Sequence, residues 1–172
     1  MSDRPPIVLV TGGARSGKSR FALARGESFG SPRVFVATAE ARDEEMAARI
    51  ARHRAERGRL WRTVEEPMAI SSVVQRQRGG VVLIDCLTLW LANQMGDCAT
   101  TDVGPAVDEL VEALSSRRSA VVVVTNEVGL GIVPESALAR AFRDATGFLN
   151  QRVAATADEL FLLVAGQALR IK

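Results

Sequence analysis

The sequence is short of the residues from which several classes of protein are built. Its 172 residues include only two cysteines, Cys86 and Cys98, so we expect neither a disulfide framework nor a cysteine metal cluster. Aromatic residues make up 5% of the chain, and 22 basic residues against 20 acidic ones leave a net charge of +2. A nucleic-acid binder needs aromatic stacking or a basic surface, so no nucleic-acid partner is expected.

Long apolar runs and targeting segments are also missing. The apolar runs are interrupted by Asp85 or stop within about ten residues, whereas a transmembrane helix needs about 20. The N-terminus has no basic segment followed by an apolar one, as a secretory signal would have. We therefore expect no membrane span and a cytoplasmic location.

The sequence does contain an alternation of strand and helix patterns typical of a folded α/β protein. Short apolar runs rich in β-branched residues predict buried strands at Ile7–Thr11, Val34–Ala37, Val81–Ile84, Ala120–Thr125 and Leu160–Val164. Gln167–Lys172 adds a predicted edge strand. Helices are predicted at Lys18–Glu27, Asp43–Arg57, after Pro67, at Cys86–Gln94, Val103–Ser116 and Glu135–Ala155. The pattern predicts one domain over residues 1–172, with three layers and a mostly parallel sheet.

The strongest motif joins the first predicted strand to the first helix. Residues Gly12, Gly13, Ala14, Arg15, Ser16, Gly17, Lys18 and Ser19 match G-x-x-x-x-G-K-S/T in full. Glycines let successive backbone N–H groups point at phosphate oxygens, at the positive end of the following helix. Lys18 is expected to reach the β- and γ-phosphates, and the Ser19 hydroxyl to ligate Mg²⁺. The predicted fold class is therefore a P-loop NTPase-like α/β domain.

Two further strand ends carry polar residues. Asp85 ends a buried strand, where P-loop proteins hold Mg²⁺ directly or through water. Asn126 and Glu127 follow the Ala120–Thr125 strand, at the edge where open α/β sheets bind ligands. A capped loop before the next helix is an equally good interpretation of that segment. The Asn-Lys-x-Asp motif of regulatory GTPases does not occur in the sequence.

His53 is the single histidine and lies on the predicted helix Asp43–Arg57. Its spacing from apolar residues of that helix fits a core histidine. Arg49 and Arg57 stand four residues before and after it, so the three side chains would form a cationic ridge. Nearby guanidinium groups would keep the imidazole neutral, as a nucleophile must be. Spacing alone leaves a structural and a catalytic histidine both open.

Together these segments resemble the bifunctional adenosylcobinamide kinase/adenosylcobinamide-phosphate guanylyltransferase family of cobalamin synthesis. The resemblance covers nearly the whole chain. It rests on residues 10–19, 37–38, 43–50 leading to His53, 61–65, 125–129, 131–135, 142–144 and 150–152. The helix ending in His53 and the segment Asn126–Glu135 are far more specific than the P-loop, which many families share.

The resemblance implies two reactions and a set of site residues. ATP or GTP would phosphorylate the aminopropanol hydroxyl of adenosylcobinamide, and GMP from GTP would then pass through a histidine to the corrinoid phosphate. The products would be adenosylcobinamide-GDP and pyrophosphate. His53 would be the guanylylated residue, Lys18 of the P-loop would be the second catalytic residue, and the subunits would form a homotrimer. The nucleotide site would be completed by Ala37, Thr38, Ala39, Arg54, Arg57, Glu65 and Asp85, with Ser19 and Asp85 as Mg²⁺ ligands.

Two other interpretations compete with this one. A monofunctional P-loop kinase for another small alcohol would use the same loop, with His53 structural. A nucleotide-dependent switch that works by binding a partner is disfavoured, because the guanine-reading motif is missing. The sequence does not distinguish ATP from GTP as the phosphate donor.

Overall fold

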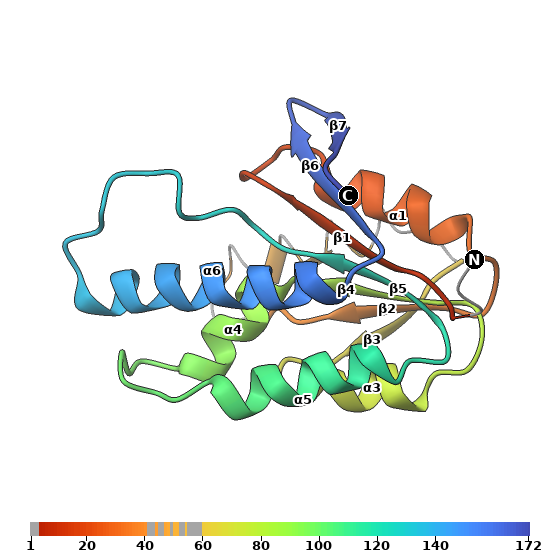
Figure 1. Cartoon of the computed structure of the whole chain (residues 1–172), viewed down its shortest axis with the longest axis horizontal. Helices are drawn as coiled ribbons and strands as arrows, with labels where there is room; N and C mark the ends of the chain where they lie inside the picture. The colour runs from red at the N-terminus through yellow and green to blue at the C-terminus, as the bar shows by residue number, and fades with distance from the viewer. Residues whose placement is uncertain (1–3, 41–43, 45–46, 49, 52–53, 55–59) are drawn as a thin grey trace.

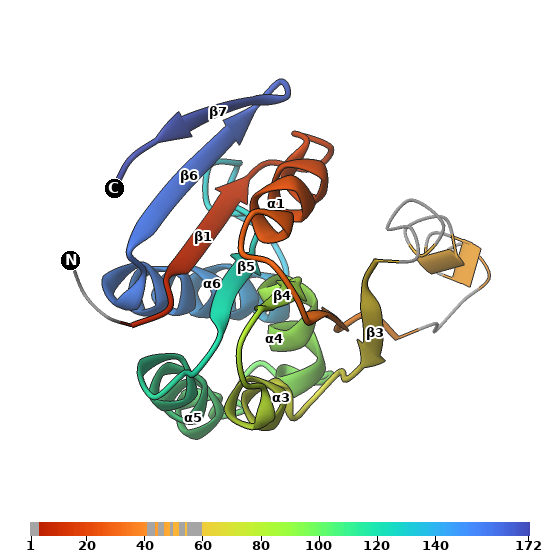
Figure 2. The same ribbon diagram turned by 90° about the vertical axis from the view of Figure 1, so that its right-hand side faces the viewer.

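The computed structural model of the chain describes residues 4–40, 44, 47–48, 50–51, 54 and 60–172. Seven strands form one sheet in the order β3-β2-β4-β5-β1-β6-β7, as Figures 1 and 2 show. All neighbouring strands pair in parallel except β6 and β7. The predicted mostly parallel sheet is therefore confirmed. The strands are β1 (Ile7–Gly12), β2 (Arg33–Ala37), β3 (Arg62–Glu65), β4 (Val81–Asp85), β5 (Ala120–Val124), β6 (Glu159–Val164) and β7 (Gln167–Arg170).

The described helices cover both faces of this sheet and make the three predicted layers (Figure 2). They are α1 (Lys18–Glu27), α3 (Ile70–Arg76), α4 (Leu87–Met95), α5 (Gly104–Ser115) and α6 (Ala137–Thr156). Of these, α1 packs on one face and the other four pack on the opposite face. The predicted helix Asp43–Arg57 lies largely outside the described residues, although residues 44, 47–48, 50–51 and 54 are helical. None of the described helices is long and apolar enough to cross a membrane.

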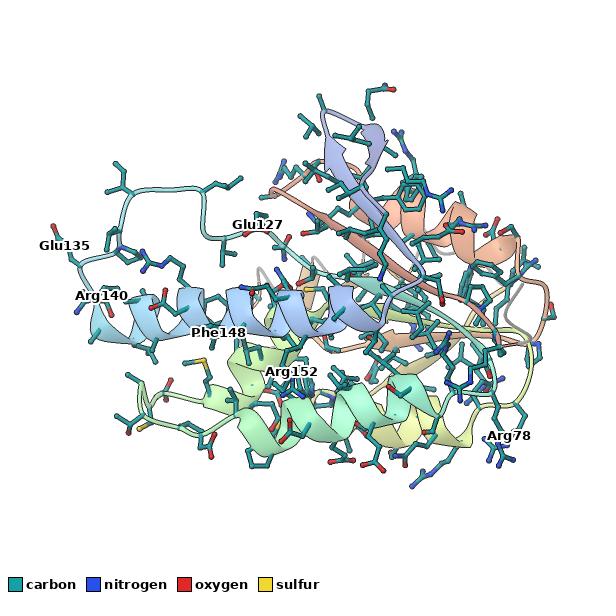
Figure 3. All side chains as sticks on the ribbon, in the orientation of Figure 1. Arg78, Glu127, Glu135, Arg140, Phe148 and Arg152 are labelled. Atoms are coloured by element: carbon teal, nitrogen blue, oxygen red, sulfur yellow. The ribbon has the colours of Figure 1, made fainter. Side chains whose placement is uncertain are left out.

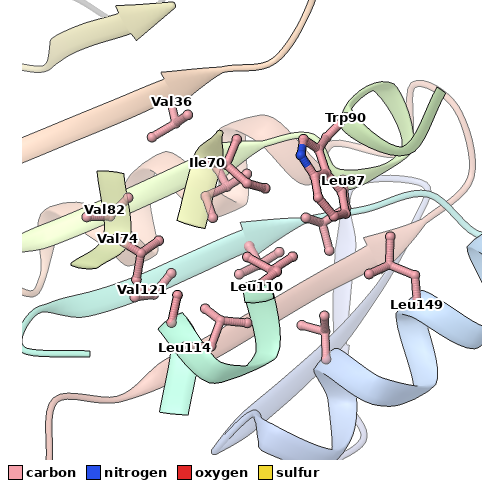
Figure 4. Close-up of a cluster of buried hydrophobic side chains, with 14 of the residues drawn as sticks. Val36, Ile70, Val74, Val82, Leu87, Trp90, Leu110, Leu114, Val121 and Leu149 are labelled. Carbon is pink, nitrogen blue, oxygen red and sulfur yellow. The ribbon is translucent and has the colours of Figure 1, made fainter. Parts of the chain in front are cut away.

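Two apolar cores lie on either side of the sheet. In β5, Val122 and Val124 face α1, whereas Val121 and Val123 face the four-helix layer. All four side chains are buried, which explains why the central strands are unbroken apolar runs. Figure 4 shows the larger core, where the Trp90 side chain packs among aliphatic side chains of the sheet and helices.

The strand that the sequence did not predict is β3. It pairs only with β2 and forms one edge of the sheet. Its sequence is Arg-Thr-Val-Glu, with both charged ends exposed and the middle residues half-buried. An edge strand with solvent on one side needs no apolar run, so the pattern that revealed the central strands is missing here. The predicted edge strand at the C-terminus is confirmed as β7, which ends two residues earlier than expected.

The position of β5 determines how the site is assembled. β5 lies between β1, which leads into the P-loop, and β4, which ends at Asp85. The register places Asp85 beside Val124, and Val124 beside Val10. The carboxyl ends of these strands therefore meet at one edge of the sheet, where an open α/β fold binds its ligands.

Candidate functional site

The P-loop wraps from the end of β1 into α1, and two of its glycines are required by the backbone. Gly12 has a φ of 145°, and a Cβ there would overlap the main-chain carbonyl of Leu163 in β6. Gly17 has a φ of 97°, and a Cβ there would lie 3.2 Å from the Cα of Gly166. The Gly166 N–H donates to the Ser16 carbonyl at 2.9 Å. The β6–β7 turn therefore supports the loop from outside and fixes the course of its backbone.

Lys18 lies under the loop rather than in solvent. Its side-chain ammonium donates to the Gly13 carbonyl at 2.6 Å and lies 3.5 Å from Ser16 Oγ. Only 7% of the residue is exposed. Gly17 precedes α1 without a side-chain cap, so the first-turn N–H groups present the positive end of the helix dipole at the loop. A buried cation and a helix N-terminus at one place favour phosphate binding.

Ser19 and Asp85 lie together at the rim of the loop. The Ser19 hydroxyl donates to Asp85 Oδ2 at 3.0 Å, although 66 residues separate them. A hydroxyl and a carboxylate are the hard oxygen ligands that Mg²⁺ prefers, and Mg²⁺ commonly uses one or two carboxylates plus substrate phosphates. In the part of the chain that the structure describes, no cluster of three or more His, Cys, Asp or Glu could hold a metal. The pair therefore fits Mg²⁺ bound together with a nucleotide.

Two more of the predicted residues, Ala37 and Glu65, lie in one row with Asp85 at this edge. Ala37 pairs with Asp85 on one side and with Glu65 on the other. The Glu65 carboxylate lies 3.5 Å from the Arg54 guanidinium, with 64% and 66% of the two side chains exposed. An exposed ion pair of this kind adds little stability, so both side chains can exchange partners at low cost.

Thr38 has a role that the sequence did not indicate. Its side chain is fully buried, and its hydroxyl accepts from the Cys86 N–H at 2.8 Å and donates to the Cys86 carbonyl at 2.9 Å. The side chain therefore joins the end of β2 to the residue after Asp85. The neighbouring Ala39 is half-buried. Contact of Thr38 and Ala39 with nucleotide stays a prediction.

His53 and Arg57 lie outside the described residues, as does Arg49. The nucleophile and the cationic ridge predicted around it therefore stay predictions.

A partly buried polar network follows Asp85, and the sequence did not predict it. The Asn126 amide donates to Thr88 Oγ1 at 2.6 Å, and Thr88 Oγ1 lies 3.0 Å from the Cys86 sulfur. On the other side, Asn150 donates to the Asn126 carbonyl at 3.1 Å and accepts from the Thr125 hydroxyl at 2.7 Å. These residues come together through the packing of α4 and α6 beside the end of β5, so no local motif could reveal them.

Cys86, at the centre of this network, is a free and buried thiol. Burial raises its pKa, the neighbouring Asp85 carboxylate raises it further, and hydrogen bonding to Thr88 opposes both effects. A thiol held in its protonated form is a poor nucleophile.

Comparison with known proteins identifies the family of the chain. A model of the family described as "Cobinamide kinase / cobinamide phosphate guanyltransferase" matches residues 8–171. The chain belongs to this family. It is 41% identical to the "Bifunctional adenosylcobalamin biosynthesis protein CobU" of Escherichia coli (strain K12), with 96% of the chain and 99% of the relative aligned. It is 39% identical to the "Bifunctional adenosylcobalamin biosynthesis protein CobP" of Pseudomonas aeruginosa, with 95% and 96% aligned.

Membership of the cobinamide kinase/cobinamide phosphate guanyltransferase family confirms the predicted enzyme class. It also favours the bifunctional interpretation over a monofunctional kinase. Among solved structures, the RadB recombinase has a TM-score of 0.53 at 14% identity, covering 91% of the chain and 73% of that protein. A second solved structure, an ATPase domain, has a TM-score of 0.50 at 13% identity, covering 94% and 70%. These likenesses concern the fold alone, and they confirm the P-loop NTPase-like class.

Proposed function

We propose that the protein phosphorylates the hydroxyl of adenosylcobinamide with ATP or GTP, and then transfers GMP from GTP to the resulting phosphate. The products are adenosylcobinamide-GDP and pyrophosphate. Family membership supplies the two activities, and one observation supports their location: the P-loop has the Lys18 ammonium beneath it and the Ser19–Asp85 pair at its rim.

The P-loop and Lys18 bind the triphosphate in both reactions. The N–H groups at the start of α1 and the Lys18 ammonium stabilise negative charge on the leaving diphosphate or pyrophosphate. Ser19 and Asp85 would hold Mg²⁺, which when bound neutralises phosphate charge. The aligned row of Ala37, Glu65 and Asp85 supports a nucleotide site that continues along this sheet edge, as the resemblance implies.

Guanylyl transfer proceeds through His53 in two displacements. A neutral imidazole nitrogen attacks the α-phosphorus of GTP, so a P–N bond forms while the bond to pyrophosphate breaks. An oxygen of the corrinoid phosphate then attacks the same phosphorus, the P–N bond breaks, and the imidazole is released. Dividing one difficult transfer into two displacements is the advantage of a covalent intermediate.

The experiment is to incubate the protein with Mg²⁺ and GTP labelled at the α-phosphorus, and then to run a denaturing gel. We expect a covalent label that acid removes and alkali does not, because that lability is typical of a phosphorus–nitrogen bond. GTP labelled at the γ-phosphorus is the control and should leave no label, since pyrophosphate departs.

The matched variant is His53→Ala, which removes the chain's single histidine. It should bind GTP and take up no label. If the wild-type protein binds GTP but takes up no covalent label, the histidine intermediate is contradicted. A P-loop kinase is then the better interpretation. The homotrimer and the cytoplasmic location stay predictions.

A further inference from the structure

Glu127 is a half-buried carboxylate beside the P-loop to which neither reaction has yet given a role. It follows β5, the strand between the P-loop strand and the Asp85 strand. Its N–H donates to the Gly12 carbonyl at 3.2 Å, so its backbone is bonded to the first residue of the phosphate loop. Figure 3 shows the Glu127 side chain at the base of the loop that leads to α6.

The segment that carries Glu127 is held on both sides. The preceding residue, Asn126, is bonded through its side chain to Thr88 and through its carbonyl to Asn150. The Thr125 N–H donates to the Val10 carbonyl of β1 at 3.0 Å. With the peptide on its N-terminal side fixed at these points, Glu127 has a defined place relative to the P-loop.

In the described part of the chain, the Glu127 carboxylate lacks a partner that would balance its negative charge beside the P-loop. Among the described residues, no cation pairs with its carboxylate, and no donor forms a side-chain hydrogen bond to it. Glu65 and Glu159, by contrast, pair with Arg54 and Arg25. A carboxylate beside a site for triphosphate repels that ligand. The position is therefore unfavourable for nucleotide binding alone, and it points to a substrate group that donates a proton.

We propose that Glu127 is the general base of the kinase reaction, accepting the proton of the corrinoid hydroxyl. This inference rests on the proposed function. As the hydroxyl oxygen attacks the γ-phosphorus, a new P–O bond forms and the bond between the γ-phosphorus and the β–γ bridging oxygen breaks. The nucleoside diphosphate leaves, and the hydroxyl proton passes to the Glu127 carboxylate, which later releases it to water.

Asp85 is less suited to this task because its carboxylate accepts from the Ser19 hydroxyl and fits the metal position. Guanylyl transfer does not need such a base, since a neutral imidazole and a phosphate oxygen attack with lone pairs that are already free. Glu127 should therefore matter for one of the two reactions and not for the other.

The test compares the two reactions in the same variants. Glu127→Gln removes the base and nearly preserves the shape of the side chain. Glu135→Gln is the matched control, because Glu135 is an exposed glutamate at the far end of the same loop. Three quantities are measured: transfer of γ-labelled phosphate to adenosylcobinamide, covalent labelling from α-labelled GTP, and the Kd for GTP. Thermal unfolding verifies that both variants are folded.

We expect Glu127→Gln to lower kcat of phosphoryl transfer by about 100- to 10,000-fold, the usual contribution of a general base. Its α-label and its Kd for GTP should stay within about threefold of wild type, and Glu135→Gln should resemble wild type in all three. Phosphoryl transfer by Glu127→Gln within threefold of an active wild type would overturn the inference. If Glu127→Gln lost phosphoryl transfer and α-labelling equally and bound GTP more weakly, the inference would also be overturned. Glu127 would then have a metal-binding role. A wild type that labels neither adenosylcobinamide nor itself would refute the proposed function.

Discussion

Replacing Thr38 by valine separates the structural role of this residue from the nucleotide-binding role that the sequence predicted. Threonine and valine have nearly the same shape, so Thr38→Val removes the hydroxyl and leaves the fully buried position filled. Both hydrogen bonds to the Cys86 main chain, at 2.8 and 2.9 Å, are lost. Their loss loosens the connection between the end of β2 and the residue that follows Asp85.

The size of the effect follows from what the Cys86 main chain retains. Its carbonyl still accepts from the Trp90 N–H at 3.1 Å, so only its N–H is left without a partner. A buried donor without a partner costs about 1–3 kcal/mol, and the second lost hydrogen bond adds about 1 kcal/mol. We therefore expect Thr38→Val to lower the free energy of unfolding by about 2–4 kcal/mol. Thr38→Ser keeps the hydroxyl and loses one methyl group, which costs about 1 kcal/mol.

Thermal and urea unfolding followed by circular dichroism measures this difference. For a chain of this length, about 1 kcal/mol changes Tm by about 2–4 °C. The valine variant should therefore unfold roughly 4–16 °C lower than wild type, and the serine variant only about 2–4 °C lower. The Kd for GTP, measured well below both transitions, completes the test. A valine variant as stable as wild type but defective in GTP binding would refute this reasoning and return Thr38 to the nucleotide site.

Two further predictions concern the glycines of the P-loop and the two thiols. Gly12→Ala should lower the free energy of unfolding by about 1–3 kcal/mol through backbone strain, because the φ of Gly12 is 145°. The overlap of the new Cβ with the carbonyl of Leu163 in β6 should lower it further. Gly13→Ala, where a Cβ would meet nothing within 4 Å, should unfold like wild type. With a thiol reagent, Cys98 should react in the native protein, because it is exposed and hydrogen bonding to a neighbouring threonine lowers its pKa. Cys86, whose pKa burial raises, should react only on unfolding. Peptide mass spectrometry that found Cys86 modified in the native protein would contradict this.

The central fold could be predicted because its signal is local. Strands such as β5, buried on both faces, need apolar residues at every position, and its one alanine and four consecutive valines satisfy that need. The predicted bounds of α1 match the structure, because the P-loop motif determines where the helix begins. The strand β3 was missed because one edge of it is open to solvent, so two of its four residues are charged.

The site could be predicted only where its residues are close in sequence or follow a strand. Lys18 and Asp85 were predicted in this way. In the structure Lys18 lies under the phosphate loop, and the Ser19 hydroxyl donates to Asp85 at 3.0 Å at its rim. The contacts of Thr88 and Asn150 with Asn126 were not predicted, because they span 38 and 24 residues and depend on how α4 and α6 pack beside β5. Thr38 lies at the expected place, but its buried hydroxyl is directed at Cys86, an orientation that no motif encodes.

The insertion of β5 between β1 and β4 has a mechanical consequence for catalysis. Two consecutive residues at its end contact opposite parts of the site: the Asn126 side chain holds Thr88 in the helix after Asp85, and the Glu127 N–H holds Gly12 of the P-loop. One peptide segment therefore connects the helix that follows Asp85 to the phosphate loop. A shift of about 1 Å in the spacing between them can cost as much as about 100-fold in rate. We therefore expect loss of the contacts around Asn126 to slow both reactions, whereas loss of the Glu127 carboxylate should slow only one.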